Sequence, residues 1–237
     1  MSKNSKNSLI EIELSGLRAS AGKKEILRGI DLCVKKGEFI TILGQNGAGK
    51  TTLLKSIIGL GVKCTGAVTA SGISASKTTI NEIRKKCAYL PQGFDIDKNF
   101  PVLARDIVNI GGGTPEGISE AVRELKIENL TDKPFGFLSG GEKQKILLAM
   151  VLSRRPAILL MDEPNLNLDP MAYAVMTGFL QEAAKKHLIT VLFVTHLASM
   201  IPGSCGRVLV LKEGKITYDG SPRRLLKMKK STEFIYG

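Results

Sequence analysis

The chain has 237 residues, of which 43% are hydrophobic and 24% are charged, and its formal net charge is +12. This composition excludes a disordered chain and predicts a globular protein, either one large domain or one domain with an inserted subdomain. The excess of lysine and arginine suits an anionic partner, namely a nucleotide, a nucleic acid or an anionic membrane surface, although solubility alone would also account for it.

The sequence carries few signals for targeting or redox chemistry. No hydrophobic run approaches the roughly 18–20 residues that span a bilayer, and the polar residues 1–8 do not resemble a secretory signal. The four cysteines are scattered and include no Cys-x-x-Cys pair, so we expect neither a disulfide framework nor a zinc site. A reducing cytosol is the simplest location for such a chain.

Hydrophobic patterning along the chain alternates short strands with helices. Strands are expected over residues 9–14, 26–34, 39–43, 66–70, 87–90, 157–161, 189–194, 207–211 and 215–218, the last two as a hairpin. Helices are expected over residues 52–58, 79–86, 103–110, 116–125, 142–153 and 171–186. The early strands indicate a small antiparallel β layer with a loop over 61–65. Residues 93–137 lack a strand pattern and indicate a helical insertion, and a basic stretch follows the hairpin at 223–230.

Residues 44–51 read Gly-Gln-Asn-Gly-Ala-Gly-Lys-Thr, which is the pattern of a phosphate-binding P-loop. The loop lies between a buried strand and a helix, the context in which this pattern has its mechanism. Its glycines allow backbone N–H groups to point at a triphosphate, Lys50 would reach the β- and γ-phosphates, and the Thr51 hydroxyl would ligate Mg²⁺. The predicted nucleotide contacts are Gly44, Asn46, Gly47, Ala48, Gly49, Lys50, Thr51 and Thr52.

Two carboxylates, Asp162 and Glu163, follow the apolar strand over 157–161. We expect this strand to neighbour the P-loop strand, so that both carboxylates face the phosphates. Asp162 would then hold Mg²⁺ through water, and Glu163 would be the general base for the attacking water. His196 also ends a strand, at the edge where ligands bind, and could hydrogen-bond the γ-phosphate. Adjacent carboxylates can instead be ordinary surface residues, and a lone histidine is more often structural; His187 has no comparable context.

The segment Leu-Ser-Gly-Gly-Glu-Lys-Gln at 138–144 resembles the signature motif of ATP-binding-cassette (ABC) transporters. Other motifs of that family occur in the family's order: Pro91-Gln92 resembles the Q-loop, Asp162-Glu163 the acidic strand end, Leu168-Asp169 the end of the D-loop and Thr195-His196 the switch histidine. The chain is therefore similar to the ATP-binding subunit of an ABC transporter over about residues 9–226.

This resemblance implies an α/β fold of the P-loop NTPase (ABC ATPase) class, with a mainly parallel core sheet, a small antiparallel β layer and an inserted helical subdomain. The implied division is a flexible polar tail (1–8), a single ABC ATPase domain (9–226) and a basic C-terminal tail (227–237). Within the domain, residues 9–92 and 156–226 would form the nucleotide-binding core, and residues 93–155 the helical subdomain.

The resemblance also implies an ATPase that uses ATP and Mg²⁺ and forms a homodimer on binding ATP. Ser139, Gly140 and Gly141 would contact the γ-phosphate held by the partner chain, with Asp169 also near the nucleotide. Gln92 would complete the shell of Mg²⁺ and water. An integral membrane permease would be the partner, with a possible solute-binding protein in the same system. With such a partner, the chain would lie on the cytoplasmic face of the membrane. We expect no nucleic-acid partner.

The cargo is indicated only by resemblance in the segment after the Q-loop. Residues 89–92, 95–102 and 106–108 resemble those of zinc or manganese importers, with iron-chelate importers second. The rivals are an ABC exporter or lipid-transport ATPase and, less well supported, a soluble ABC protein acting on nucleic acid or the ribosome. Such proteins usually carry two cassettes or a long coiled-coil insertion, whereas only residues 93–137 separate Gln92 from the signature.

Three departures from the family pattern accompany these matches. Ala21 stands where the family usually stacks an aromatic side chain on adenine, which leaves base selectivity open. Lys145 stands where many relatives have arginine, which keeps the charge and loses the fork geometry. Residues 165–169 differ from the usual D-loop of small residues, so the coupling across the dimer interface is open as well.

Overall fold

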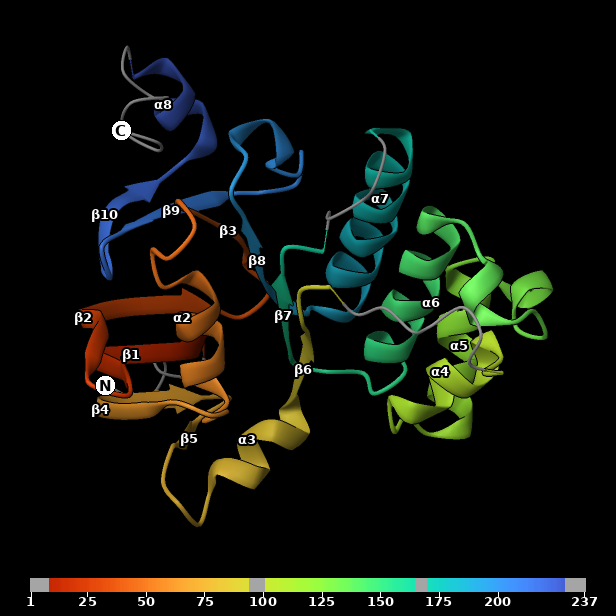
Figure 1. Cartoon of the computed structure of the whole chain (residues 1–237), viewed down its shortest axis with the longest axis horizontal. Helices are drawn as coiled ribbons and strands as arrows, with labels where there is room; N and C mark the ends of the chain where they lie inside the picture. Colours follow the sequence, from red (N-terminus) through yellow and green to blue (C-terminus); the bar gives the residue numbers. More distant parts are fainter. Residues whose placement is uncertain (1–8, 94–100, 165–169, 229–237) are drawn as a thin grey trace, which may run out of the picture.

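Two sheets carry the fold of the computed structural model, which describes residues 9–93, 101–164 and 170–228 (Figure 1). The smaller sheet is antiparallel and has the order β2-β1-β4-β5. Its strands are β1 (Ile10–Ala21), β2 (Lys24–Lys35), β4 (Lys63–Ala70) and β5 (Ile73–Ser74). The expected antiparallel layer is present, and it includes β5, a short strand that was not predicted.

Strand β1 is twice as long as predicted because a bulge interrupts its alternation. The register with β2 shifts between Leu14 and Leu17, and Gly16 in this interval has a φ of 57°. Leu17 and Ala19 resume the buried face beyond the bulge. A period-two pattern ends at such a position although the strand continues. Similarly, β4 begins at Lys63, inside the segment expected to be a loop.

The larger sheet has the order β10-β9-β3-β8-β7-β6. Its strands are β3 (Phe39–Leu43), β6 (Cys87–Leu90), β7 (Ile158–Asp162), β8 (Thr190–Thr195), β9 (Arg207–Lys212) and β10 (Lys215–Gly220). All neighbouring pairs are parallel except β9 and β10, which form the predicted hairpin.

The expectation that the strand before Asp162 neighbours the P-loop strand is wrong. Strand β8 lies between β7 and β3, because the chain that leaves β7 returns through a helix into the position between them. Strand order in a parallel sheet is set by such crossovers and not by order along the chain. The carboxyl ends of β3, β8 and β7 still meet at one edge, which is what the candidate site requires.

Helices α4 to α7 pack on one face of the larger sheet, and α2, α3 and the antiparallel sheet lie toward the other (Figure 1). The helices are α2 (Lys50–Ile57), α3 (Ile80–Lys86), α4 (Ala104–Ile110), α5 (Pro115–Glu124), α6 (Gly140–Leu152), α7 (Pro170–His187) and α8 (Pro222–Lys227). Single 3-10 turns occur at Glu128–Leu130, Phe135–Phe137 and Ala198–Met200. In the described part of the chain, every helix is too short or too polar to cross a membrane.

Strand β7 shows why the core strands are continuously apolar. Leu159 and Met161 pack into the core that contains α6 and α7, whereas Ile158 and Leu160 pack into the core shared with α2 and the antiparallel sheet. Both faces are covered, so alternation disappears from the sequence. This burial on both sides fixes the strand ends that carry the polar site residues.

Part of the basic stretch at 223–230 is helical and not a simple tail. Ser221 accepts a hydrogen bond from the Arg224 N–H as the N-cap of α8, and Leu225 is fully buried. The N-cap and one buried anchor are enough to hold this short helix on the core. The basic residues of this part of the stretch therefore belong to the helix α8.

Candidate active site

The P-loop connects β3 to α2 and adopts a conformation that requires glycine. Gly47 and Gly49 have φ values of 82° and 105°, in the region that side chains with a Cβ disfavour. A Cβ on Gly49 would also lie 2.9 Å from Leu27 Cδ2 on β2. The loop therefore wraps closely over the antiparallel sheet and ends at the N-terminus of α2, where backbone N–H groups and the helix dipole favour an anion.

Lys50, the first residue of α2, folds back over the loop. Its Nζ donates to the carbonyl oxygens of Gly44 at 2.7 Å and Gln45 at 3.0 Å. Only 5% of Lys50 is exposed, which is unusual for lysine and depends on these partners. Its Nζ also lies 3.4 Å from Glu163 Oε1, and this ion pair joins the P-loop to the end of β7.

Glu163 is the centre of a buried constellation. It is 6% exposed, and its φ of 47° places its backbone in the left-handed region directly after β7. Its Oε2 lies 3.1 Å from His196 Nδ1 at the end of β8, and it accepts a hydrogen bond of 3.5 Å from Gln92 Nε2 after β6. The structure thus brings Lys50, Gln92, Glu163 and His196 together from four separate chain segments. Such a strained backbone position is typical of functional sites.

Asp162 lies beside this constellation and is 1% exposed. Burial raises the pKa of its carboxyl group, although hydrogen bonds with the side chains of Thr51 and Tyr89 act in the opposite direction. The Tyr89 hydroxyl donates to Oδ2 at 3.1 Å, and Oδ1 is buried with no hydrogen-bond partner among the described residues. Burial, together with the Asp162 charge, raises the pKa of Tyr89, so its hydroxyl remains a donor at neutral pH.

Three further predicted contacts lie on or next to the loop. Asn46 lines a surface hollow between the P-loop and the β9–β10 turn. The carbonyl oxygen of Ala48 accepts a hydrogen bond of 3.1 Å from the Gly214 N–H in that turn. Thr52 lies in the first turn of α2, and its carbonyl accepts a hydrogen bond from Ser56.

The signature segment forms the N-terminus of α6. Ser139 is its N-cap: the Ser139 hydroxyl donates to Glu142 Oε2 at 2.8 Å, and the Ser139 N–H donates to the same oxygen at 2.9 Å. These two bonds hold the pKa of Glu142 below its usual value. Gly140 and Gly141 complete the first turn, so α6 begins two residues before the predicted helix start at Glu142.

The structure does not bring the signature to the P-loop of the same chain. Figure 1 shows α6 and α2 on opposite sides of β7. The helices that begin at the signature and at the P-loop therefore belong to separate parts of the molecule. Asp169, the remaining predicted contact, lies outside the described residues.

Residues 27–166, more than half of the chain, match the model of the ABC transporter family. The chain belongs to this family. It is an ATP-binding and ATP-hydrolysing transporter subunit, as the motifs predicted. ATP-binding subunits of the family generally dimerise and work with membrane permeases.

Similar proteins support this assignment and differ in the transport systems they are named for. The chain is 30% identical to the zinc import ATP-binding protein ZnuC of Halorhodospira halophila, over 91% of this chain and 79% of that protein. It is 32% identical to the energy-coupling factor transporter ATP-binding protein EcfA of Methanocaldococcus jannaschii, over 84% and 75%. Among solved structures it resembles cbiO1 from Clostridium perfringens, part of the ABC transporter complex cbiONQ, with a TM-score of 0.82, 28% identity and coverage of 96% and 94%. The predicted P-loop NTPase fold is confirmed.

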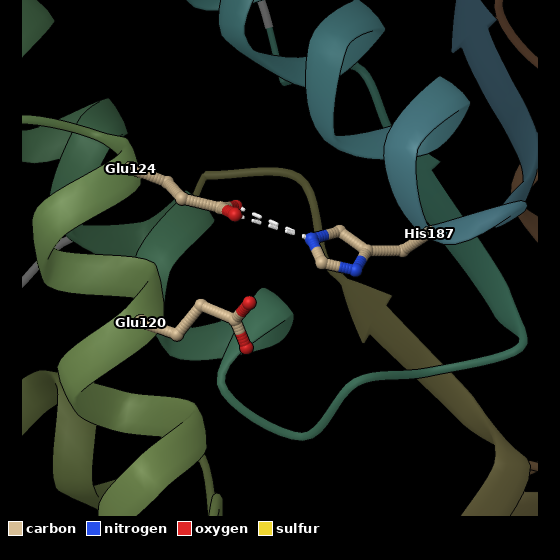
Figure 2. Close-up of side chains that lie close together, drawn as sticks. All are labelled: Glu120, Glu124 and His187. Atoms are coloured by element: carbon tan, nitrogen blue, oxygen red, sulfur yellow. Dashed lines mark hydrogen bonds and ion pairs between the residues drawn. The ribbon is translucent and has the colours of Figure 1, made fainter.

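A second group of ionisable side chains lies away from this ABC ATPase site. Figure 2 shows Glu120 and Glu124 of α5 facing His187 at the end of α7, with His187 Nε2 3.3 Å from Glu124 Oε1. Their ligand-type atoms lie within 4.8 Å of one another, as in a metal site. However, Arg155 Nη2 lies 2.6 Å from Glu120 Oε2, and Lys186 forms an ion pair with Glu124. Two cations therefore balance the two carboxylates, and the group joins α5 to α7.

Two features of the molecule were not predicted from the sequence. Tyr89 was assigned to a strand and to the segment that resembles metal importers but to no role in the site, although its position three residues before Gln92 at a strand end was a usable signal. His187 was assigned no particular context, because its partner Glu124 is 63 positions away and no local spacing reports that contact.

Proposed function

We propose that this ABC ATPase powers the import of a metal ion or metal chelate through a partner membrane permease. The observation that carries the cargo assignment is the segment after β6, where Pro101-Val102 and Asp106-Ile107-Val108 resemble metal importers. Similarity to a zinc import protein supports it. In the fold, Ile107 and Val108 are buried on α4, and the Leu103 N–H donates to Asp106 at 3.0 Å. This segment therefore belongs to a well-packed helix of the helical part, the part that we propose receives the permease.

The buried constellation supports a distinct role for each predicted residue. Glu163 is the general base, since its buried carboxylate lies at the sheet edge beside the P-loop, with His196 Nδ1 3.1 Å and Gln92 Nε2 3.5 Å from its Oε2, where it would accept a proton from a water next to the γ-phosphate. Lys50 neutralises charge on the β- and γ-phosphates, and His196 hydrogen-bonds the γ-phosphate. Gln92, which already reaches Glu163, orients the water and links the sheet edge to the helical part.

The residues beside Lys50 fit a magnesium ion. Asp162 offers a buried oxygen, Oδ1, that lacks a hydrogen-bond partner in the described part of the chain, and a hydroxyl and an amide lie nearby in Thr51 and Gln92. Oxygen ligands of this kind suit Mg²⁺, which keeps several waters. When bound, the ion neutralises phosphate charge. Thr51 and Asp162 would hold it, with Gln92 completing its shell.

A homodimer would complete the site. Because Ser139, Gly140 and Gly141 lie away from their own P-loop, we infer that they contact the γ-phosphate bound by the partner chain. Apolar groups near the signature support an interface there: Phe137 and Met171 are each 78% exposed, and Met171 lines a hollow with Gly141. We place this dimer on the cytoplasmic face of the membrane, below the permease, with a solute-binding protein delivering the cargo and no nucleic acid involved.

Uptake in cells that carry either the wild-type chain or Lys50→Ala tests the cargo. Loss of the Lys50 ammonium group, which binds the phosphates, should abolish uptake of at least one of radiolabelled zinc, manganese or an iron chelate. Uptake of an unrelated amino acid should stay unchanged. Equal uptake of all three metals in both strains would contradict a metal importer. Tagged wild-type chain recovered from membranes should bring its permease with it, and recovery of ribosomes in its place would support the soluble rival.

A further inference from the structure

Tyr89 connects the end of β6 to the end of β7, which carries both acidic residues of the site. It lies on β6, paired with Leu160 of β7, and its side chain reaches along the sheet to Asp162, two residues beyond that pair. Three residues after Tyr89, Gln92 makes the corresponding contact with Glu163. The end of β6 therefore touches both carboxylates of β7.

The hydrogen bond from Tyr89 distinguishes the two oxygens of Asp162. An aspartate side chain has a broad, nearly two-fold torsion about its last bond, so an unrestrained carboxylate exchanges its oxygens. Here Oδ2 accepts the Tyr89 hydroxyl at 3.1 Å, whereas Oδ1 is buried and has no hydrogen-bond partner in the part of the chain that is described. Oδ2 is thus anchored by Tyr89, and Oδ1, with the Thr51 side chain beside the same carboxylate, has no hydrogen-bond partner in the described residues that a ligand would have to displace.

We propose that Tyr89 is a positioning residue for magnesium: its hydroxyl presets the Asp162 carboxylate in the orientation that receives the ion of Mg-ATP. The proposal rests on the role of Asp162 proposed above and adds a residue that would act through Asp162, which its hydroxyl contacts. A second consequence is that β6 links the Q-loop to magnesium binding, since Tyr89 lies on this strand and Gln92 follows two residues after its end.

The test compares nucleotide affinity with and without Mg²⁺, in a Glu163→Gln background so that ATP is not consumed. Affinity for a fluorescent ATP analogue is measured in magnesium and in chelator. Tyr89→Phe removes only the hydroxyl, and a hydrogen bond to a charged group is worth about tenfold or more in an equilibrium. We expect the affinity gained from magnesium to fall about tenfold, while the affinity in chelator stays within about twofold.

Tyr218→Phe is the matched control. The Tyr218 hydroxyl donates to the Ser221 carbonyl at 2.8 Å, and Tyr218 lies on β10, at the other edge of the sheet from β6. This variant loses the same group and should leave both affinities unchanged. An equal loss in the two variants would contradict a specific role for Tyr89.

The remaining outcomes separate this proposal from the proposed function. A full magnesium gain in Tyr89→Phe, together with its loss in Asp162→Asn, would overturn the positioning role and leave Asp162 as a magnesium ligand. A full gain in Asp162→Asn would overturn the role of Asp162 itself. Loss of affinity in both magnesium and chelator for Tyr89→Phe would indicate a structural defect and also overturn the proposal.

Discussion

Two regions of this ABC ATPase contain the same kinds of side chain in different surroundings. Each has two carboxylates, a lysine and a histidine: Asp162 and Glu163 with Lys50 and His196, and Glu120 and Glu124 with Lys186 and His187. In the first, the Lys50 and Glu163 side chains are 6% and 7% exposed. In the second, the Lys186 side chain is 58% exposed. Burial of the lysine and the carboxylates separates the two groups, since both histidines are partly exposed.

The difference in burial changes what the charges do. Water and salt screen the ion pairs of Glu120 and Glu124, so they contribute little energy and join α5 to α7. At the sheet edge, screening is weak, and charges held there are costly unless partnered. The second group is assembled from two helix surfaces, whereas the first is assembled from the ends of parallel strands. Because holding charges there is costly, a buried group of this kind points to a ligand site, whereas an exposed group of the same composition does not.

The largest expected effect comes from breaking the buried group at its centre. Glu163→Gln keeps the shape of the side chain and removes its basic oxygen, so ATP turnover should fall about 10²–10⁴-fold while ATP still binds. Phosphate release measures the first, and the variant should form a dimer with ATP but not with ADP on size-exclusion chromatography. Turnover within a few-fold of wild type, or a monomer at saturating Mg-ATP, would count against the assignment.

Sequence patterns revealed the buried group well because each of its members follows a local signal. The P-loop pattern placed Lys50, and apolar runs placed Asp162, Glu163 and His196 at strand ends. The position of β7 was wrong, because the crossover that inserts β8 leaves no mark in local patterning. Tyr89 was missed since its role depends on a neighbouring strand, and the bulge at Gly16 concealed half of β1.

The second group could not be predicted for a related reason. Glu120 and Arg155 are 35 positions apart, and Glu124 and His187 are 63 apart. Charged residues on exposed helix surfaces are common, so nothing in the sequence selects these pairs from other combinations. Only the packing of α5 beside α7 makes them neighbours.

A second prediction concerns stability at the buried group. Because burial raises the pKa of Asp162 in the folded state, its carboxyl group favours folding when protonated, and that contribution is lost as the pH rises through the folded pKa. Asp162→Asn keeps an oxygen for Tyr89 and carries no charge. Above that pH, its melting temperature should exceed that of wild type by about 2–4 °C, the shift for about 1 kcal/mol in a chain of this size. Thermal melts of both proteins from pH 4 to pH 8 measure this difference. A melting temperature of Asp162→Asn below that of wild type at pH 7–8 would contradict the prediction that the Asp162 charge destabilises the fold.

The smallest effect, with the opposite sign, is expected at Glu120. The hydrogen bond from Arg155 holds the pKa of Glu120 below its usual value, so its contribution to stability is present above the unfolded pKa and is lost as the pH falls through the folded pKa. Glu120→Gln should therefore lower the melting temperature at neutral pH. Since the Arg155 side chain is 57% exposed, the loss should be at most about 1 kcal/mol, or about 2 °C, and should shrink in high salt.

ATP turnover of Glu120→Gln should equal that of wild type, since the charge lies on α5 and away from the strand ends. Adding Zn²⁺ or Mn²⁺ separates an ion-pair group from a metal site. A metal that bound the folded chain at this group would raise the melting temperature with concentration, and Glu124→Gln would reduce the rise. We expect no such difference between wild type and Glu124→Gln, because Arg155 and Lys186 already supply the positive charge that a metal would bring. A metal-dependent rise in melting temperature that Glu124→Gln abolishes would contradict this expectation. The exposed group would then be a ligand site as well.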